Sequence, residues 1–176
     1  MTDKKSLLST ILKERVLVLD GAMGTMIQQY ELDESDFKGD KFTKHNADLK
    51  GNNDILCLTK PQVISEIHEK YLEAGCDIIE TNTFNANRIS QADYETEEHC
   101  YDLNKKAAAL AKEACMKFSS KEKPRFVAGA LGPTNKTLSI SPKVEDPGYR
   151  DVTFDKMRES YEEQVRGLID GGADII

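Results

Sequence analysis

The sequence lacks several features that would assign a chain of 176 residues to a class at once. It has no apolar run long enough to span a bilayer. Its first residues lack the apolar block and the small-residue cleavage site of a secretory signal. Its 24 Lys and Arg are outnumbered by 31 Asp and Glu, the net charge is −7, and there is no basic stripe. We therefore expect neither a membrane protein nor a nucleic-acid-binding protein, and a cytoplasmic location is the default expectation.

Cysteine is scarce, and its four copies do not cluster. Cys57, Cys76, Cys100 and Cys115 form no Cys-x-x-Cys pair and fall in different expected elements. Disulfides are rare in cytoplasmic proteins, and an isolated Cys behaves as a small apolar residue. The sequence predicts four buried free thiols, with neither a local metal motif nor a redox motif.

Three short apolar runs each pass directly into polar or glycine-rich residues. Residues 16–19 lead into 20–25, residues 78–79 lead into 80–84, and residues 126–131 lead into 132–135. A buried strand whose carboxyl end carries hydrogen-bonding groups is how a parallel α/β protein builds a ligand site. The pattern predicts three strands that end at one shared face and one shared site. Residues 16–19 are continuously apolar, so we expect this first strand to be buried on both faces.

Helical patterns separate the expected strands. Apolar residues recur at helical spacing over residues 7–15, 61–74, 97–117 and 154–169, and the first of these helices is a candidate cap for the bottom of a barrel. We predict Thr59 as the N-cap of the second helix, with Pro61 in its first turn, Gln62 completing a capping box and Gly75 at its end. In the last helix, Met157, Tyr161, Val165 and Leu168 are expected to form the apolar face.

Two long polar stretches are expected to be loops. Residues 30–53 are irregular, with Phe37, Phe42 and Leu49 as anchors, and residues 136–152 contain two prolines and a glycine. Long insertions after strands of α/β domains usually serve function. Gly21 and Gly24 form a Gly-x-x-Gly turn that lets a ligand approach the backbone, but they lack the longer dinucleotide-binding pattern.

The stretch 72–79 is echoed by the last eight residues, 169–176. Each copy has a helix end, glycine, a small residue, Asp and two isoleucines. The second copy stops inside an expected buried strand, which would leave backbone groups unpaired. We therefore expect residues 1–176 to be the N-terminal part of a longer barrel domain, truncated in the fourth strand.

The order of elements predicts an α/β fold, because strands alternating with helices imply parallel strands and right-handed crossovers. About four βα units would form the first half of a TIM-type (β/α)8 barrel. A doubly wound open sheet is the alternative, and periodicity alone does not choose between them.

Three motifs together resemble the homocysteine S-methyltransferase family. They are residues 20–26 (DGAMGTM), 80–84 (ETNTF) and 129–135 (GALGPTN). Residues 50–54 and 139–142 are similar to the cobalamin-dependent branch of that family, the methionine synthases. The resemblance covers about residues 16–176 and implies an α/β barrel that binds homocysteine.

The resemblance also implies cofactors. Three cysteine thiolates of the family hold a zinc ion that binds the substrate sulfur and lowers the thiol pKa. In the methionine synthases, methylcobalamin donates the methyl group and is recharged from methyltetrahydrofolate by later domains of the same chain. The family's zinc cysteines lie in Asn-Cys and Gly-Cys-Cys contexts that are absent here. We expect the zinc cysteines beyond Ile176, no bound cofactor in this chain and no methyl transfer by it alone.

Candidate site residues are therefore those for the amino-acid part of homocysteine. Asp20 and the backbone of Gly21, Ala22 and Met23 are expected to hold its ammonium and carboxylate groups. The whole set is Asp20, Gly21, Ala22, Met23, Thr25, Glu80, Thr81, Asn82, Thr134 and Asn135. The structural alternatives are that Asp20 caps a turn, that Glu80 sits in a buried ion pair, and that Thr134 and Asn135 stabilise their loop.

Other functions stay open at the level of sequence. Betaine or methylmethionine would replace methylcobalamin as the donor in other homocysteine methyltransferases. An unrelated barrel lyase would need a second paired acid or a Schiff-base lysine at a strand end, and we find neither. A non-catalytic binding or partner module remains if the chain naturally ends at Ile176.

Overall fold

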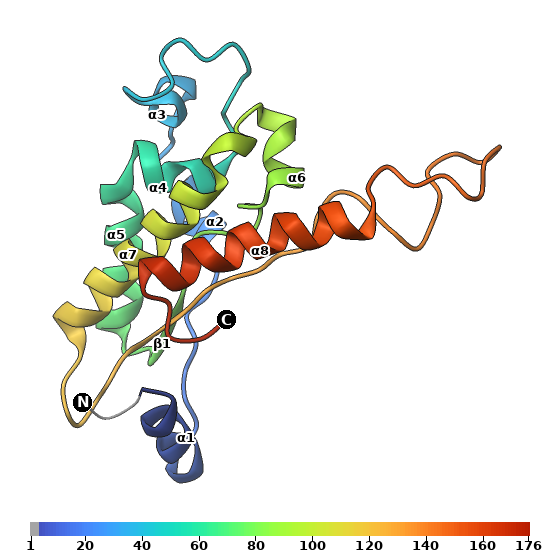
Figure 1. The fold of residues 1–176 in the computed structure, drawn as a ribbon. Coiled ribbons are helices and arrows are strands. Elements are labelled where there is room, and N and C mark those ends of the chain that lie inside the picture. Colours follow the sequence, from blue (N-terminus) through green and yellow to red (C-terminus); the bar gives the residue numbers. More distant parts are fainter. Residues whose placement is uncertain (1–3) are drawn as a thin grey trace.

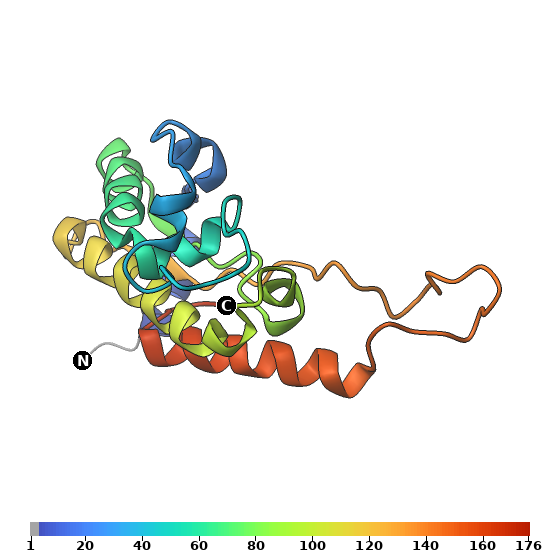
Figure 2. The same cartoon turned by 90° about the horizontal axis from the view of Figure 1, so that it is seen from above.

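The computed structural model describes residues 4–176, apart from the side chain of Lys5. Helices pack against the short strands, and the chain is drawn from two directions in Figures 1 and 2. In chain order the α-helices and strands are α1 (Lys4–Glu14), α2 (Met23–Gln28), α3 (Glu34–Lys38), α4 (Leu56–Thr59), α5 (Pro61–Ala74), β1 (Ile78–Glu80), α6 (Arg88–Gln91), α7 (Cys100–Phe118), β2 (Phe126–Ala128) and α8 (Phe154–Gly171). Three 3₁₀ turns cover Asn53–Ile55, Ala92–Tyr94 and Glu97–His99. No helix in the described part of the chain is both long and apolar enough to cross a membrane.

The strands are parallel, as the alternation of strands and helices predicts. β1 pairs with β2 so that Ile79 lies opposite Val127. Isolated parallel bridges add Leu19 beside Ile78 on one side and Ile175 beside Ala128 on the other. The order across the sheet therefore follows the order along the chain, without the reversal that a doubly wound sheet contains. The α/β class is confirmed, and the arrangement is consistent with part of a barrel.

The expectation that residues 16–19 form a strand buried on both faces is wrong for this structure. Val16 is 85% exposed and Val18 is 57% exposed, and only Leu19 makes a bridge. This segment bonds along one edge to the chain around β1, since Ile78 N donates to Val18 O at 3.1 Å. β2 is also shorter than the expected 126–131, because Ala130 N turns to the hydroxyl of Thr81.

At two places an aspartate carboxylate binds a backbone N–H of the neighbouring strand segment, a contact that we call an aspartate clasp. The carboxylate of Asp77 accepts from Val18 N at 2.9 Å, and that of Asp174 accepts from Val127 N at 3.0 Å. The two aspartates occupy the same place in the repeated sequence. The counter-ion of Asp77 is Arg15, which donates two bonds to it at 2.7 and 2.9 Å. The counter-ions of Asp174 are Lys112, which donates to it at 2.6 Å, and Lys4, which donates at 3.2 Å. The internal repeat is therefore also a repeat of interactions.

Helix α5 has the predicted apolar face but begins differently. Val63, Ile64, Ile67 and Leu72 are buried, and Gly75 ends the helix with a φ of 109°, as predicted. Pro61 stands in the first turn, but the N-cap is Lys60 and makes no side-chain cap bond. Thr59 is the last residue of α4 and donates to Ile55 O at 3.4 Å, so its predicted capping role is wrong.

Helix α8 packs on α7 through small residues rather than through the predicted apolar face. Of Met157, Tyr161, Val165 and Leu168, only Leu168 is buried; Ser160, Gln164 and Gly167 are the other buried residues of the helix. A Cβ atom at Gly167 would lie 2.7 Å from Tyr101 O, and one at Gly171 would lie 2.3 Å from Lys105 O. The absence of side chains at these glycines lets the two backbones approach closely.

Both long loops were predicted correctly in outline. In residues 30–53 the anchors Phe37, Phe42 and Leu49 are buried, but the loop also contains α3, whose capping box of Asp33 and Asp36 we did not predict. Residues 136–152, which we call the arm, form no helix or strand and project from the body (Figures 1 and 2). The four cysteines are buried and free, as predicted.

Candidate functional site

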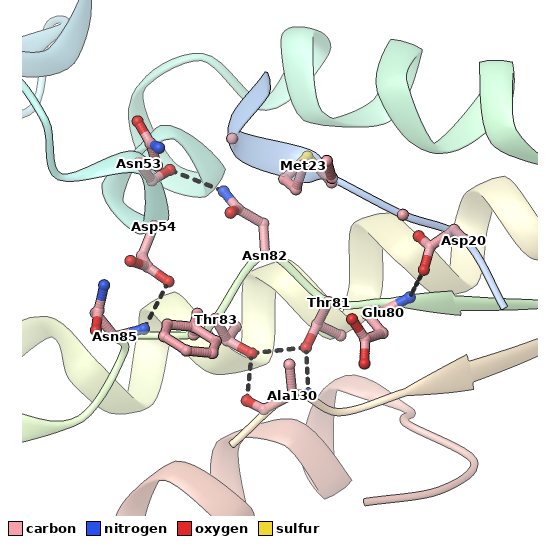
Figure 3. A pocket seen from close by; sticks show the side chains of 14 residues that line it. Asp20, Met23, Asn53, Asp54, Glu80, Thr81, Asn82, Thr83, Asn85 and Ala130 are labelled. Atoms are coloured by element: carbon pink, nitrogen blue, oxygen red, sulfur yellow. Dashed lines mark hydrogen bonds between the residues drawn. The ribbon is translucent and has the colours of Figure 1, made fainter. Parts of the chain in front are cut away.

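A cavity of about 410 Å³ lies where β1 ends and the chain enters α2. Its walls come from the segment before and within α2, the end of the loop 30–53, the residues after β1, and Ala130 after β2 (Figure 3). The lining residues are Asp20, Gly21, Ala22, Met23, Gly24, Asn53, Asp54, Glu80, Thr81, Asn82, Thr83, Phe84, Asn85 and Ala130. The cavity is therefore at the carboxyl ends of the strands, where the sequence predicts the site.

Asp20 is held at the cavity wall by the neighbouring strand. Its carboxylate accepts a hydrogen bond from Glu80 N at 3.0 Å, and its own N–H donates to Ile78 O at 2.9 Å. Burial raises the pKa of Asp20 to about 7, and the charge of Glu80 also acts in that direction. No Lys, Arg or His among the described residues forms an ion pair with Asp20. The Glu80 side chain is exposed and makes no ion pair there either, so the expected alternative of a buried pair does not hold.

The hydroxyl of Thr81 lines the cavity but is already occupied. It accepts from Ala130 N at 3.0 Å and lies 2.6 Å from the hydroxyl of Thr83, which in turn donates to Ala130 O at 2.8 Å. Because Thr83 uses its proton on Ala130, the bond between the two threonines must be donated by Thr81. This closed network joins the end of β1 to the end of β2, and it gives Thr81 a bracing role (Figure 3).

Asn82 is oriented by the loop that faces it. Its amide nitrogen donates to Asn53 O at 2.8 Å and lies 3.7 Å from the thiol of Cys57. Asn82 is 7% exposed, so this amide group is fixed on the cavity wall with its nitrogen turned toward the loop. The thiol of Cys57 is fully enclosed, and burial raises its pKa strongly.

Sequence reasoning missed Asp54, which the loop 30–53 brings to the cavity. Asp54 is 3% exposed, and its carboxylate accepts from Asn85 N at 3.2 Å. Burial raises its pKa to about 6. The cavity is also lined by Asn53, Thr83, Phe84, Asn85 and Ala130, which were not among the predicted site residues although all but Asn85 lie in the motifs 50–54, 80–84 and 129–135. The stretch 50–54 contributed to the family resemblance, and that was the one available signal for Asn53 and Asp54.

Three predicted site residues do not line the cavity. Thr25 is exposed on α2. Thr134 donates to Lys136 O at 2.8 Å, and Asn135 donates to Asp93 at 2.6 Å. These contacts match the loop-stabilising alternative for Thr134 and Asn135. Asp20, Gly21, Ala22, Met23, Glu80, Thr81 and Asn82 are brought together as predicted.

The cavity lining carries acidic side chains and no basic ones. It contains three carboxylates, from Asp20, Asp54 and Glu80, and no Lys, Arg or His. The donors available to a ligand anion include the backbone N–H groups at the start of α2 and the side-chain amides of Asn53 and Asn85. Such a cavity suits a ligand with a cationic group and a small anionic group that backbone amides can bind.

The residues described do not fit a zinc site. No group of three or more His, Cys, Asp or Glu side chains among them is placed to hold a metal ion. Burial raises the pKa of every cysteine thiol, to about 11 for Cys76 and to about 12 for Cys100 and Cys115, which disfavours the thiolate that zinc binds. We derive no metal chemistry from these residues.

Solved structures of the homocysteine methyltransferase MmuM from Escherichia coli share this fold. The oxidized form matches with a TM-score of 0.69 at 22% identity, the metallated form with 0.68 at 22%, and the apo form with 0.60 at 21%. Each match covers 94% of this chain and 53%, 54% and 50% of MmuM, respectively. The chain thus has the α/β fold of a barrel-type methyltransferase and spans about half the length of these relatives.

The sequence defines the family more narrowly. Residues 17–176 match the family model described as homocysteine S-methyltransferase. The chain belongs to the homocysteine S-methyltransferase family, and the resemblance drawn from its three motifs is confirmed at that level.

Proposed function

We propose that the cavity binds the amino-acid part of homocysteine, and that the chain is the homocysteine-binding part of a methionine synthase. The observation that carries the proposal is the cavity at the strand ends, with Asp20 on its wall and without a basic side chain in its lining. The family membership supplies the substrate class.

The substrate's ammonium lies against Asp20 in this proposal. An ammonium would favour the ionised carboxylate and so offset the burial that raises the pKa of Asp20 to about 7. The substrate's carboxylate lies against the N–H groups of Gly21, Ala22 and Met23, where the chain enters α2. Thr81 and Asn82 shape the wall through the contacts that hold them.

The complete fold in this proposal is a (β/α)8 barrel, to which this chain contributes about four βα units. The sequential parallel order of Leu19, β1, β2 and Ile175 supports that fold. The zinc thiolates belong to segments outside residues 1–176, since the described cysteines do not fit them. Homocysteine bound here would present its sulfur to those segments.

We further propose methylcobalamin as the methyl donor, recharged from methyltetrahydrofolate by later domains of the whole enzyme. The support is the resemblance of residues 50–54 and 139–142 to the methionine synthases. Residues 50–54 include Asn53 and Asp54 of the cavity, whereas residues 139–142 lie in the arm. Betaine or methylmethionine as donor is the alternative. Turnover of the complete protein with each donor distinguishes them, and activity with betaine or methylmethionine alone would exclude the cobalamin assignment.

Calorimetric titration of this chain with L-homocysteine under reducing conditions tests the binding site. Asp20→Asn should weaken binding by about tenfold or more, because one charged contact is lost. Asp48→Asn is the matched control, since Asp48 is exposed and outside the cavity. A thiol acid without the ammonium group should not bind. Equal affinity of the wild type and Asp20→Asn would remove Asp20 from the site.

A further inference from the structure

Asp54 differs from Asp77 and Asp174, the two aspartates that join neighbouring strands, in having no counter-ion. The side chain of Asp77 is 2% exposed and pairs with Arg15, and that of Asp174 is 6% exposed and pairs with Lys112. Asp54 is 3% exposed, yet no Lys, Arg or His in the described chain pairs with it. Its one hydrogen-bond donor from another residue is Asn85 N, at 3.2 Å. A buried carboxylate without a positive partner is costly, so a partner from outside the chain is expected.

The cavity provides access for that partner. Asp54 lines the cavity, and so does Asn82. Because the amide nitrogen of Asn82 donates to Asn53 O and faces the thiol of Cys57, the amide oxygen is left free, and no described residue donates to it. Figure 3 shows Asp54 and Asn82 on the side of the cavity where Asn53 and Asn85 lie. A carboxylate oxygen and an amide oxygen are thus available on one wall.

This wall is separate from the Asp20 end. Asp20 bonds to Glu80 N, and Figure 3 shows these two residues across the cavity from Asp54. The charge of Glu80 acts on the pKa of Asp20, whereas the charge of Asp54 acts on the pKa of Cys57, Tyr94 and Cys100. The two carboxylates therefore sit in different surroundings and take different partners.

We infer that Asp54 and the amide oxygen of Asn82 form a subsite for a singly charged cation of the ammonium type. An ammonium group has several N–H donors and one charge, which matches one carboxylate and one neutral acceptor. The cation is either an organic ammonium or an inorganic ion such as ammonium or potassium. The inference does not require that homocysteine bind at Asp20, although homocysteine is one molecule that carries the required group.

NMR titration of this chain with methylammonium chloride at constant ionic strength tests the subsite. The Asn85 backbone amide and the Asn82 side-chain amide should shift, and tetramethylammonium, which has no N–H donor, should shift them about tenfold less at equal concentration. Asp54→Asn should weaken the methylammonium response by about tenfold or more, because an amide replaces the charged acceptor. Asp48→Asn is the control, because it removes an exposed carboxylate outside the cavity, and it should leave the response unchanged.

A second measurement guards against misfolding of the variant. The carboxyl resonance of Asp54 in the wild type should titrate near pH 6 in the free protein and at lower pH with methylammonium present. Parallel titrations with potassium chloride and L-homocysteine identify the source. If homocysteine displaces methylammonium, the subsite binds an organic ammonium. If potassium alone saturates the shifts of Asn82 and Asn85, the subsite binds an inorganic ion. Absence of a response at Asn82, Asn85 and Asp54 to all of these cations would overturn the inference while leaving homocysteine binding at Asp20 to its own test.

Discussion

The affinity of the chain for L-homocysteine should fall as the pH is lowered from 8 to 6. The pKa of Asp20 is raised to about 7 by burial, so the free carboxyl group changes its charge within this range. With a pKa of about 7, roughly 90% of Asp20 is ionised at pH 8, about half at pH 7 and roughly 10% at pH 6. If only the ionised form binds the ammonium, the apparent Kd should rise by roughly tenfold between pH 8 and pH 6.

Calorimetry at half-unit pH steps in buffers of matched ionic strength measures this profile. Asp20→Asn should bind weakly and should lose the inflection near pH 7, whereas Asp48→Asn should keep the wild-type profile. The stability of the folded chain should depend on pH in the opposite direction to homocysteine affinity. A raised pKa means that protonated Asp20 favours the folded state, so this contribution is lost as the pH rises from about 4 to about 7. A flat binding profile for the wild type, or an unchanged inflection in Asp20→Asn, would refute the reasoning.

Three further predictions concern the scaffold. Gly171→Ala should lower the free energy of unfolding in urea by about 1–2 kcal/mol, because overpacking against α7 outweighs the gain in helix propensity. Gly24→Ala is the control, since a Cβ there would have only a 3.6 Å contact, and it should not destabilise the chain. Equal stabilities of the two variants would contradict the close packing of α8 on α7. Asp77→Asn should flatten the acid-side loss of stability, because the pKa of Asp77 is lowered by its bond to Arg15 and its contribution is present above the unfolded pKa and lost as the pH falls; an unchanged acid limb would argue against this pair. Arg150→Ala should speed proteolysis within the arm several-fold without changing homocysteine affinity, since Arg150 donates to the carbonyls of residues 138, 147 and 149; uniform cleavage rates would show that the arm does not depend on this side chain.

The local sequence was sufficient for the elements whose signals are local. Helix α5 follows from its apolar spacing and from Gly75, whose φ of 109° few other residues adopt readily. The clasps of Asp77 and Asp174 were visible as a repeat, although the repeat did not reveal their partners. Thr59 was misassigned because the same hydroxyl serves equally well at the end of the preceding helix, where it bonds to Ile55 O.

Contacts between distant segments were beyond the reach of periodicity. The buried face of α8 is set by Gly167 and by the backbone of α7, so the larger apolar side chains beside it remain partly exposed. In the site, Asp20 and Glu80 were found because parallel strands end at one edge. Asp54 was missed because it lies in a short 3₁₀ turn after the loop 30–53 and not at the end of a strand. The bracing role of Thr81 depends on Ala130, which is far from it in sequence.

The two aspartate clasps also have a consequence for folding fidelity. A slip of one residue between strands would turn Asp77 to the opposite face of the sheet and separate it from Val18 N. The same error at Asp174 would separate it from Val127 N. Each slip would leave a buried carboxylate without its backbone donor, so a misaligned sheet would lose stability at two separate contacts. β1 and β2 pair over only three positions. The two aspartates can therefore specify one alignment of the strands although the strands are short.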